Sequence, residues 1–185
     1  IAFLSDRSGN MEIFRMNIDG SGQKQLTNSP EKKEHPEFSP DGRKIIFVRD
    51  LGGKTEIWIM NRDGTDQKRL TSGAWRDERP FISPDGGKIL FMSNRDGNYE
   101  IYVMAADGSN QNRITHTPHW EIFPTWSPDG REIAYASKFK ADGRMQGMIR
   151  IMNADGGNDR PITRIETRDE NPIWSPDGRH LLVQS

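Results

Sequence analysis

The sequence predicts an all-β protein, a β-propeller of four-stranded antiparallel blades, on the strength of three repeating markers. The tetrapeptide SPDG starts at Ser39, Ser83, Ser127 and Ser175, at intervals of 44, 44 and 48 residues. An Asp-Gly pair keeps the same intervals and ends at Gly20, Gly64, Gly108 and Gly156. A Leu-Thr or Ile-Thr pair begins at Leu26, Leu70, Ile114 and Ile162. Three independent markers with one period indicate a structural repeat.

Each repeat is expected to contain four short strands, named a to d in chain order. Strand a carries a proline, and Ser-Pro-Asp-Gly, which suits a type I turn with a left-handed glycine, joins it to strand b. Residues 44–48 (KIIFV) are an example of strand b, and a polar hairpin leads to strand c, such as residues 56–60 (EIWIM). The Asp-Gly turn then leads to strand d with its Leu-Thr. One such sheet cannot bury both faces alone, so the sheets must stack around an axis. The proline of strand a fits the edge nearest the axis.

The markers also give the domain organisation, a single propeller domain over residues 1–185. Residues 1–27 would supply strands b to d of a first blade, and residues 34–71, 78–115 and 122–163 three complete blades. Residues 170–184 would supply strands a and b of a closing or next blade. Two arrangements are open: a closed four-bladed ring completed by the last strand a, or a larger ring, for instance of six blades, of which this chain forms a part. The surplus strand b at 180–184 has no place in the four-bladed ring, which favours the larger one.

Composition excludes several classes of function. The net charge is −1 and basic residues occur in every blade, so we expect no nucleic-acid partner. The chain has no cysteine, which excludes disulfides and thiolate chemistry. It contains no apolar run approaching the roughly 18 residues of a membrane-spanning helix, and residues 1–5 (IAFLS) do not resemble a signal peptide.

Antiparallel order predicts which loops share a face of the propeller. The nearly invariant SPDG and Asp-Gly turns lie on one face, whereas the variable b–c hairpins and d–a connections lie on the other. Variable loops on a rigid scaffold are where binding residues concentrate. The variable face is therefore the predicted binding site, around the mouth of the central channel. The residues leading into strand a are its candidates: Glu34, His35, Glu78, Arg79, Glu121, Phe123, Glu170 and Asn171. Together with Asp77 and Asp169 they form either a partly acidic funnel for a basic peptide or a cation, or a solvated rim balanced by nearby cations.

The fourth repeat is four residues longer than the others, and all the extra length lies in its b–c hairpin. There Lys138, Phe139 and Arg144, with Lys140 and Met145, form either a basic and hydrophobic contact patch or a tolerated surface insertion. Trp126 and Trp174 are expected to pack between blades. Trp120 could do the same or, like Trp75, form an exposed anchor.

The sequence shows no catalytic constellation. It contains no GxSxG, no P-loop and no dinucleotide-binding glycine motif after a strand. His116 and His119 lie three residues apart without an evident third metal ligand. We therefore expect neither catalysis, nor a metal, nor a cofactor.

Residues 5–27 (SDRSGNMEIFRMNIDGSGQKQLT) and 93–115 (SNRDGNYEIYVMAADGSNQNRIT), with the four SPDG turns, resemble the TolB-like β-propeller family over essentially the whole chain. The fourth repeat departs from the family pattern, with Arg150 replacing the glutamate that precedes strand c. The resemblance implies a propeller, usually of six blades, in a periplasmic or secreted protein. It also implies non-catalytic binding of a protein or peptide of the cell envelope, as the family's namesake binds the peptidoglycan-associated lipoprotein in the Tol–Pal system. An envelope lipoprotein is thus one candidate partner.

Two enzyme alternatives remain open. Similar propellers screen substrates for some serine peptidases, and a propeller lyase acting on uronate polymers would need histidines converging on a metal in the channel. Only His35 is well placed for that.

Overall fold

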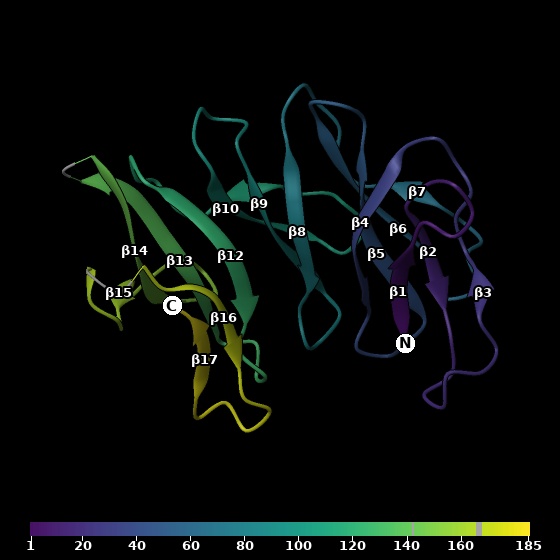
Figure 1. Cartoon of the computed structure of the whole chain (residues 1–185). Helices are drawn as coiled ribbons and strands as arrows, with labels where there is room; N and C mark the ends of the chain where they lie inside the picture. The colour runs from purple at the N-terminus through teal and green to yellow at the C-terminus, as the bar shows by residue number, and fades with distance from the viewer. Residues whose placement is uncertain (142, 166–167) are drawn as a thin grey trace.

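The computed structural model describes residues 1–141, 143–165 and 168–185, and these form five antiparallel sheets that stand side by side in an arc (Figure 1). The first sheet contains β1 (Ala2–Ser5), β2 (Glu12–Arg15) and β3 (Lys24–Gln25). The second contains β4 (Lys32–Phe38), β5 (Lys44–Asp50), β6 (Thr55–Asn61) and β7 (Lys68–Arg69). The third contains β8 (Asp77–Ile82), β9 (Lys88–Ser93), β10 (Glu100–Ala105) and β11 (Asn112–Arg113). The fourth contains β12 (Trp120–Trp126), β13 (Glu132–Ala141), β14 (Arg144–Asn153) and β15 (Arg160–Pro161), and the fifth β16 (Glu170–Trp174) and β17 (Leu181–Gln184).

The predicted propeller of four-stranded antiparallel blades is confirmed, because the strands of every complete sheet lie in chain order. The a strands β4, β8, β12 and β16 contact one another in sequence and line the inner side of the arc, while the two-residue d strands lie outside. β4 and β12 begin at Lys32 and Trp120, two residues before the expected starts at 34 and 122, because pairing continues to Asp50 and Lys138.

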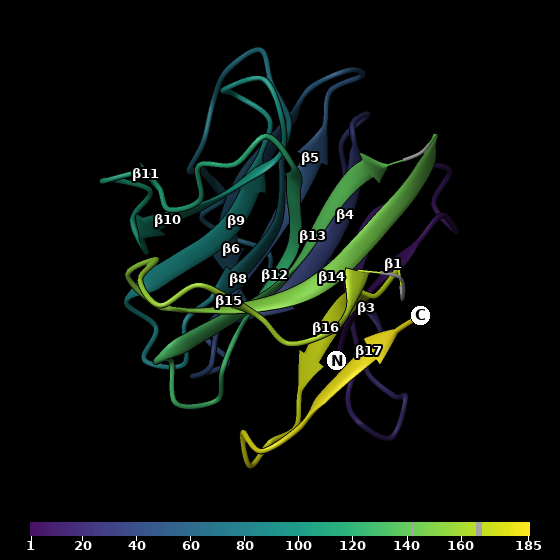
Figure 2. The same ribbon diagram turned by 90° about the vertical axis from the view of Figure 1, so that its left-hand side faces the viewer.

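The closed four-bladed ring is not formed. β16 pairs with β17 rather than with β1, and the described residues of the first and last sheets make no contact. Figure 2 views the arc from the end at which β16 and β17 lie. With a neighbouring sheet on one side only, these end sheets leave Leu4, Ile173 and Leu182 exposed.

The core lies between neighbouring sheets. Ile46, Val48 and Ile57 of the second sheet pack with Ile89 and Phe91 of the third, and all five are completely buried. Equivalent clusters join the first sheet to the second and the third to the fourth. Burial between sheets, rather than within one sheet, stabilises the repeat.

Two sequence markers have direct structural explanations. In each SPDG turn the serine hydroxyl donates to the aspartate and accepts from the first strand-b amide, as in Ser39 Oγ to Asp41 (2.6 Å) and Lys44 N to Ser39 Oγ (2.9 Å). These bonds lower the pKa of Asp41. The threonine of Leu-Thr or Ile-Thr accepts a strand-c amide, as in Ile101 N to Thr115 Oγ1 (2.8 Å). Both markers therefore satisfy backbone groups at strand ends.

Glycine in the Asp-Gly turn has a second role besides turn geometry. Gly64 has φ of +93°, and a Cβ there would lie 2.7 Å from the backbone oxygen of Leu26 in the preceding sheet. Gly108 and Gly156 approach Leu70 and Ile114 in the same way. The turn therefore needs glycine because neighbouring sheets touch at this point.

The missing glutamate of the fourth repeat was assigned to the wrong position. Glu100 lies opposite Ser93, and the corresponding partner of Ser137 is Met148. Arg150 instead faces Tyr135, as Tyr102 faces Phe91. The prediction was out of register by two residues, which the regular pairing of β13 with β14 corrects.

Candidate functional site

The loops of the propeller are divided between two ends of the arc. We call the end at which β4, β8, β12 and β16 begin the hairpin face, and the end that carries the SPDG turns the turn face. In Figure 1 the turn after β8 lies on the lower side, whereas the β5–β6 and β9–β10 hairpins lie at the upper edge.

Every a strand bends at the residue before its proline. His35, Arg79, Phe123 and Asn171 have φ of +50°, +53°, +55° and +50°, and at these points the pairing with strand b shifts register. A bulge turns a side chain away from regular alternation. A positive φ at a residue other than glycine costs on the order of 1–3 kcal/mol. The same costly geometry thus holds four chemically different side chains.

These four residues line the inner wall of the arc near the hairpin face. The Arg79 guanidinium lies 4.8 Å from the centre of the Phe123 ring. A cavity of about 310 Å³ is lined by Arg79, Phe81, Phe123, Pro124, Thr125, Asn171, Pro172, Ile173 and Gln184. Burial, and then the nearby charge of Arg79, lowers the pKa of His35. The structure thus groups these predicted residues on one surface.

The acidic candidates are largely neutralised by cations. Lys32 Nζ lies 2.5 Å from Glu34, Arg76 Nε lies 2.6 Å from Glu78, and Lys138 pairs with Glu170. All three carboxylates are half-buried. Burial lowers the pKa of Arg79, while the charges of Glu78, Glu34 and Glu170 oppose that shift. The expected acidic rim is therefore a set of ion pairs around Arg79.

Glu121 does not share the surface of the other candidate residues. Its side chain is completely buried, and it occupies the position that Lys33, Asp77 and Asp169 hold in the other sheets, all of them buried as well. The position of Glu34, Glu78 and Glu170 is filled by Ile122. The prediction failed because adjacent residues of a strand point to opposite sides, and Glu121 stands one residue earlier in the strand.

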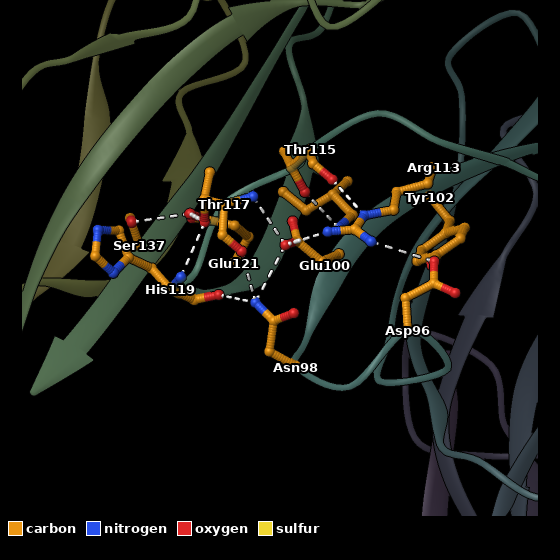
Figure 3. A network of polar contacts seen from close by, with 11 residues as sticks. Asp96, Asn98, Glu100, Tyr102, Arg113, Thr115, Thr117, His119, Glu121 and Ser137 are labelled. Atoms are coloured by element: carbon orange, nitrogen blue, oxygen red, sulfur yellow. Dashed lines mark hydrogen bonds and ion pairs between the residues drawn. The ribbon is translucent and has the colours of Figure 1, made fainter.

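Glu121 belongs instead to a polar network between the third and fourth sheets (Figure 3). It accepts hydrogen bonds from Thr117 Oγ1 (2.5 Å) and Ser137 Oγ (3.1 Å). Burial raises its pKa to about 7.

Glu100 accepts from Arg113 (2.7 Å) and from the amide of Thr117 (3.0 Å) in the same network. Asn98 donates to the carbonyl oxygen of His119. The network therefore fixes the connection over residues 114–119.

Of the hairpin candidates, Lys138 joins the inner wall through its pair with Glu170, whereas Phe139 and Arg144 lie further along the hairpin. The rings of Phe139 and His119 are 4.8 Å apart, and Arg144 is exposed near the tip. Asp142 of this hairpin lies outside the described residues. Trp120 is half exposed, whereas Trp126 is buried and its indole donates to Phe81 O of the preceding sheet, as expected for packing between blades.

One hollow on the turn face was not anticipated. A cavity of about 450 Å³ lies between the second and third sheets and is lined by residues that include Pro40, Ile59, Pro84, Ile89 and Ala106. The only hint in the sequence is the small Ala106 in the third Asp-Gly turn, where the first two turns have Ile18 and Arg62 two residues before glycine.

The described residues contain no group of three His, Asp or Glu side chains that could hold a metal ion. No helix among them is long and apolar enough to cross a membrane.

Comparison with known proteins identifies one family. The family model of the TolB β-propeller domain matches residues 1–185. The Tol-Pal system protein TolB of Geobacter sulfurreducens is 44% identical over 45 residues, which are 24% of this chain and 10% of that protein.

Two solved structures resemble the whole chain. A putative TolB from Agrobacterium tumefaciens has a TM-score of 0.81 and 28% identity, covering 99% of this chain and 69% of that one. TolB from Acinetobacter baumannii has a TM-score of 0.80 and 25% identity, covering 96% of this chain and 44% of that one. The chain therefore spans less than half of the length of the Acinetobacter protein. Its match to the Geobacter protein covers a tenth of that protein.

Enzymes with related folds are more distant. A puromycin hydrolase has 18% identity and a TM-score of 0.75, and an oligogalacturonate lyase in complex with manganese has 11% and 0.55. At these identities the likeness shows the fold alone.

Proposed function

Because the chain belongs to the TolB β-propeller domain family, we propose that it is a non-catalytic module that binds a protein or peptide of the cell envelope through its hairpin face. The compartment would be the periplasm, and an envelope lipoprotein is the partner class that the family suggests.

One observation carries this proposal. The pre-proline bulge is kept in all four a strands despite its backbone strain, yet the residue on it differs each time: His35, Arg79, Phe123 and Asn171. Strain in a scaffold tends to be retained where it aims side chains for a function. The turn face shows the opposite pattern, since its SPDG turns repeat one hydrogen-bond arrangement four times.

The chemistry of the inner wall suits a peptide. Arg79 provides a half-buried guanidinium, which binds carboxylates and stacks on rings, and Phe123 provides apolar area. Asn171 and Gln184 are joined by a hydrogen bond (3.1 Å) and present amide groups that can pair with a peptide backbone. A surface with one charge, one aromatic ring and several amides is typical of protein interfaces.

The proposal is tested with the soluble domain of the peptidoglycan-associated lipoprotein from the same genome. Its affinity is measured calorimetrically for the unchanged chain, Arg79→Ala and Phe123→Ala. We expect each substitution to weaken binding by about tenfold or more, as for residues at an interface centre. Arg43→Ala is the matched control, because Arg43 is 82% exposed in an SPDG turn on the turn face.

Equal affinity in Arg79→Ala, Phe123→Ala and Arg43→Ala would refute the hairpin face as the site. The enzyme alternatives have weaker support, since they rest on likenesses of fold alone.

A further inference from the structure

The strands β13 and β14 extend the fourth sheet beyond its other strands. Both strands are ten residues long, and their pairing continues without interruption to Ala141 and Arg144. The inner strand β12 stops pairing at Trp120 and Lys138, so the outer part of the hairpin is a two-stranded ribbon. The ends of β13 and β14 lie at the far left of Figure 1. The additional four residues thus extend ordered strands.

A cavity of about 680 Å³ lies between this ribbon and the connection that enters β12. It is lined by Pro118, His119, Trp120, Lys138, Phe139, Lys140, Gly143 and Met145. This volume is within the range of about 300–1,000 Å³ that is typical of ligand-binding pockets. His119 and Phe139 lie in contact, while Trp120 and Met145 are 50% and 42% exposed. Aromatic residues and methionine are enriched in the centres of protein interfaces.

The apolar character of this place is specific to the fourth sheet. Lys32 and Arg76 occupy the position of Trp120 in the second and third sheets, and they pair with Glu34 and Glu78 two residues later. In the fourth sheet the same two positions hold Trp120 and Ile122. A surface ion pair has therefore been replaced by an apolar pair in the sheet that carries the extended hairpin.

The direction of the Trp120 side chain follows from strand geometry. Glu121 points into the buried network, so its neighbour Trp120 must point to the other side of the strand. Trp120 thus points away from the network, and it lines the cavity.

The rim of the cavity is basic. Lys140, which lines the cavity, and Arg144, which stands between the lining residues Gly143 and Met145, are both exposed, whereas the charge of Lys138 is paired with Glu170. None of the described residues that line the cavity is acidic. Charge complementarity favours a ligand that carries carboxylates.

We propose that this cavity binds a segment of a partner protein that inserts one large apolar side chain and flanks it with acidic residues. The inference shares the hairpin face with the proposed function but uses a separate set of residues. A peptide fits better than a membrane surface, because the rings line a hollow below the ribbon tip rather than project from it.

The experiment selects short random peptides displayed on phage against the unchanged chain. Enrichment of peptides that combine acidic residues with one aromatic residue or leucine supports the proposal. Enrichment of basic peptides, or of acidic peptides without a large apolar residue, overturns it.

The selected peptide is then synthesised with a fluorescent label and titrated by anisotropy. Trp120→Ala and the charge reversal Lys140→Glu/Arg144→Glu should each weaken binding about tenfold. The charge reversal lies at exposed positions, so it tests the site even if Trp120→Ala unfolds. Ile18→Ala is the control, since Ile18 is 94% exposed on the turn face. Equal binding by all variants overturns the proposal.

Two further measurements separate the explanations. Arg79→Ala should leave this peptide's affinity unchanged, because Arg79 lies on the inner wall; a loss equal to that of Trp120→Ala would mean that the cavity is not a separate site. Vesicles containing phosphatidylglycerol should not sediment the chain, and Trp120-dependent sedimentation would overturn the peptide assignment in favour of a membrane contact.

Discussion

Lys33 Nζ lies 3.1 Å from a carboxylate oxygen of Glu12, and both side chains are almost completely buried between the first two sheets. Glu12 and Lys33 are 21 residues apart in the chain, and the equivalent pairs of residues in the later repeats have the same spacing. These pairs are Glu56 with Asp77, Glu100 with Glu121, and Met148 with Asp169. One geometric position therefore carries an attractive pair, two like-charged pairs and one pair with a single charge. Each like-charged pair is compensated by its own neighbours, such as Arg95 on Asp77 (2.9 Å) and Arg113 on Glu100 (2.7 Å).

Breaking the Glu12–Lys33 pair should be costly. Lys33→Met leaves a buried carboxylate without its cation, which is expected to lower the free energy of unfolding by about 3–5 kcal/mol. Glu12→Gln/Lys33→Met should recover at least half of that loss, because the amide oxygen of glutamine can still accept from the Ser29 amide, which now donates to Glu12 at 2.8 Å. Urea denaturation of Lys33→Met, Glu12→Gln and the double variant measures the coupling energy between Glu12 and Lys33. A double variant less stable than Lys33→Met would contradict the prediction.

Glu121 should make stability depend on pH. Its pKa is raised by burial from 4.5 to about 7 in the folded chain, so the folded state retains a proton that the unfolded state has lost between these values. The unfolding free energy should therefore fall as pH rises from about 4.5 to about 7, and then stay lower. Glu121→Gln removes this titration. We expect it to match the unchanged chain at pH 4.5 and to exceed it above pH 7.

Urea denaturation across this pH range checks the expectation. Glu34→Gln serves as the control, because Glu34 lies at the surface in an ion pair. Parallel pH curves for the unchanged chain and Glu121→Gln would show that Glu121 does not titrate in this way.

The pre-proline bulge should distinguish glycine from β-branched residues. His35 has φ of +50°, which glycine adopts freely and valine strongly resists. We expect His35→Gly to be more stable than His35→Val by about 1 kcal/mol or more. At Glu37, an exposed strand residue beyond the bulge, the order should reverse, since valine favours strands. Thermal denaturation of the four variants decides the point, and valine preferred at both positions would refute strain at His35.

The contact between sheets at the Asp-Gly turn can be separated from turn strain. Gly20 and Gly64 both have positive φ, but a Cβ on Gly20 would meet nothing within 4 Å, whereas one on Gly64 would lie 2.7 Å from Leu26 O. Gly20→Ala should therefore cost about 1 kcal/mol from strain. Gly64→Ala should cost at least about 1 kcal/mol more, because the backbone of Leu26 cannot easily move away. Equal losses by urea denaturation would argue against close packing here.

Much of the fold could be predicted from local chemistry. Ser39, Asp41 and Gly42 form a turn whose hydrogen bonds involve only neighbouring residues. The four SPDG copies could therefore be predicted to form turns without a structure. The pairing of strands followed from their order, and the division of loops between two faces followed from antiparallel pairing.

Side-chain direction at the start of strand a could not be predicted in the same way. Glu121 was grouped with Glu34 because both are acidic residues just before a strand-a proline. Glu34 stands two residues before its proline, and the residue two before Pro124 is Ile122. The bulges at His35, Arg79, Phe123 and Asn171 were also not predicted, because nothing in those residue types requires a positive φ. Proximity of Trp120 and Met145 depended on how far the β13–β14 pairing extends.

By itself the sequence determined the repeat, the strands and the turns, because each of these depends on contacts within about one repeat length. The repeated motifs also indicated the family. The tertiary structure alone decided which side chains are buried between sheets, which are turned inward by a bulge, and which meet across the β13–β14 ribbon. These outcomes depend on packing between sheets, where a shift of one residue along a strand exchanges the buried side for the exposed one.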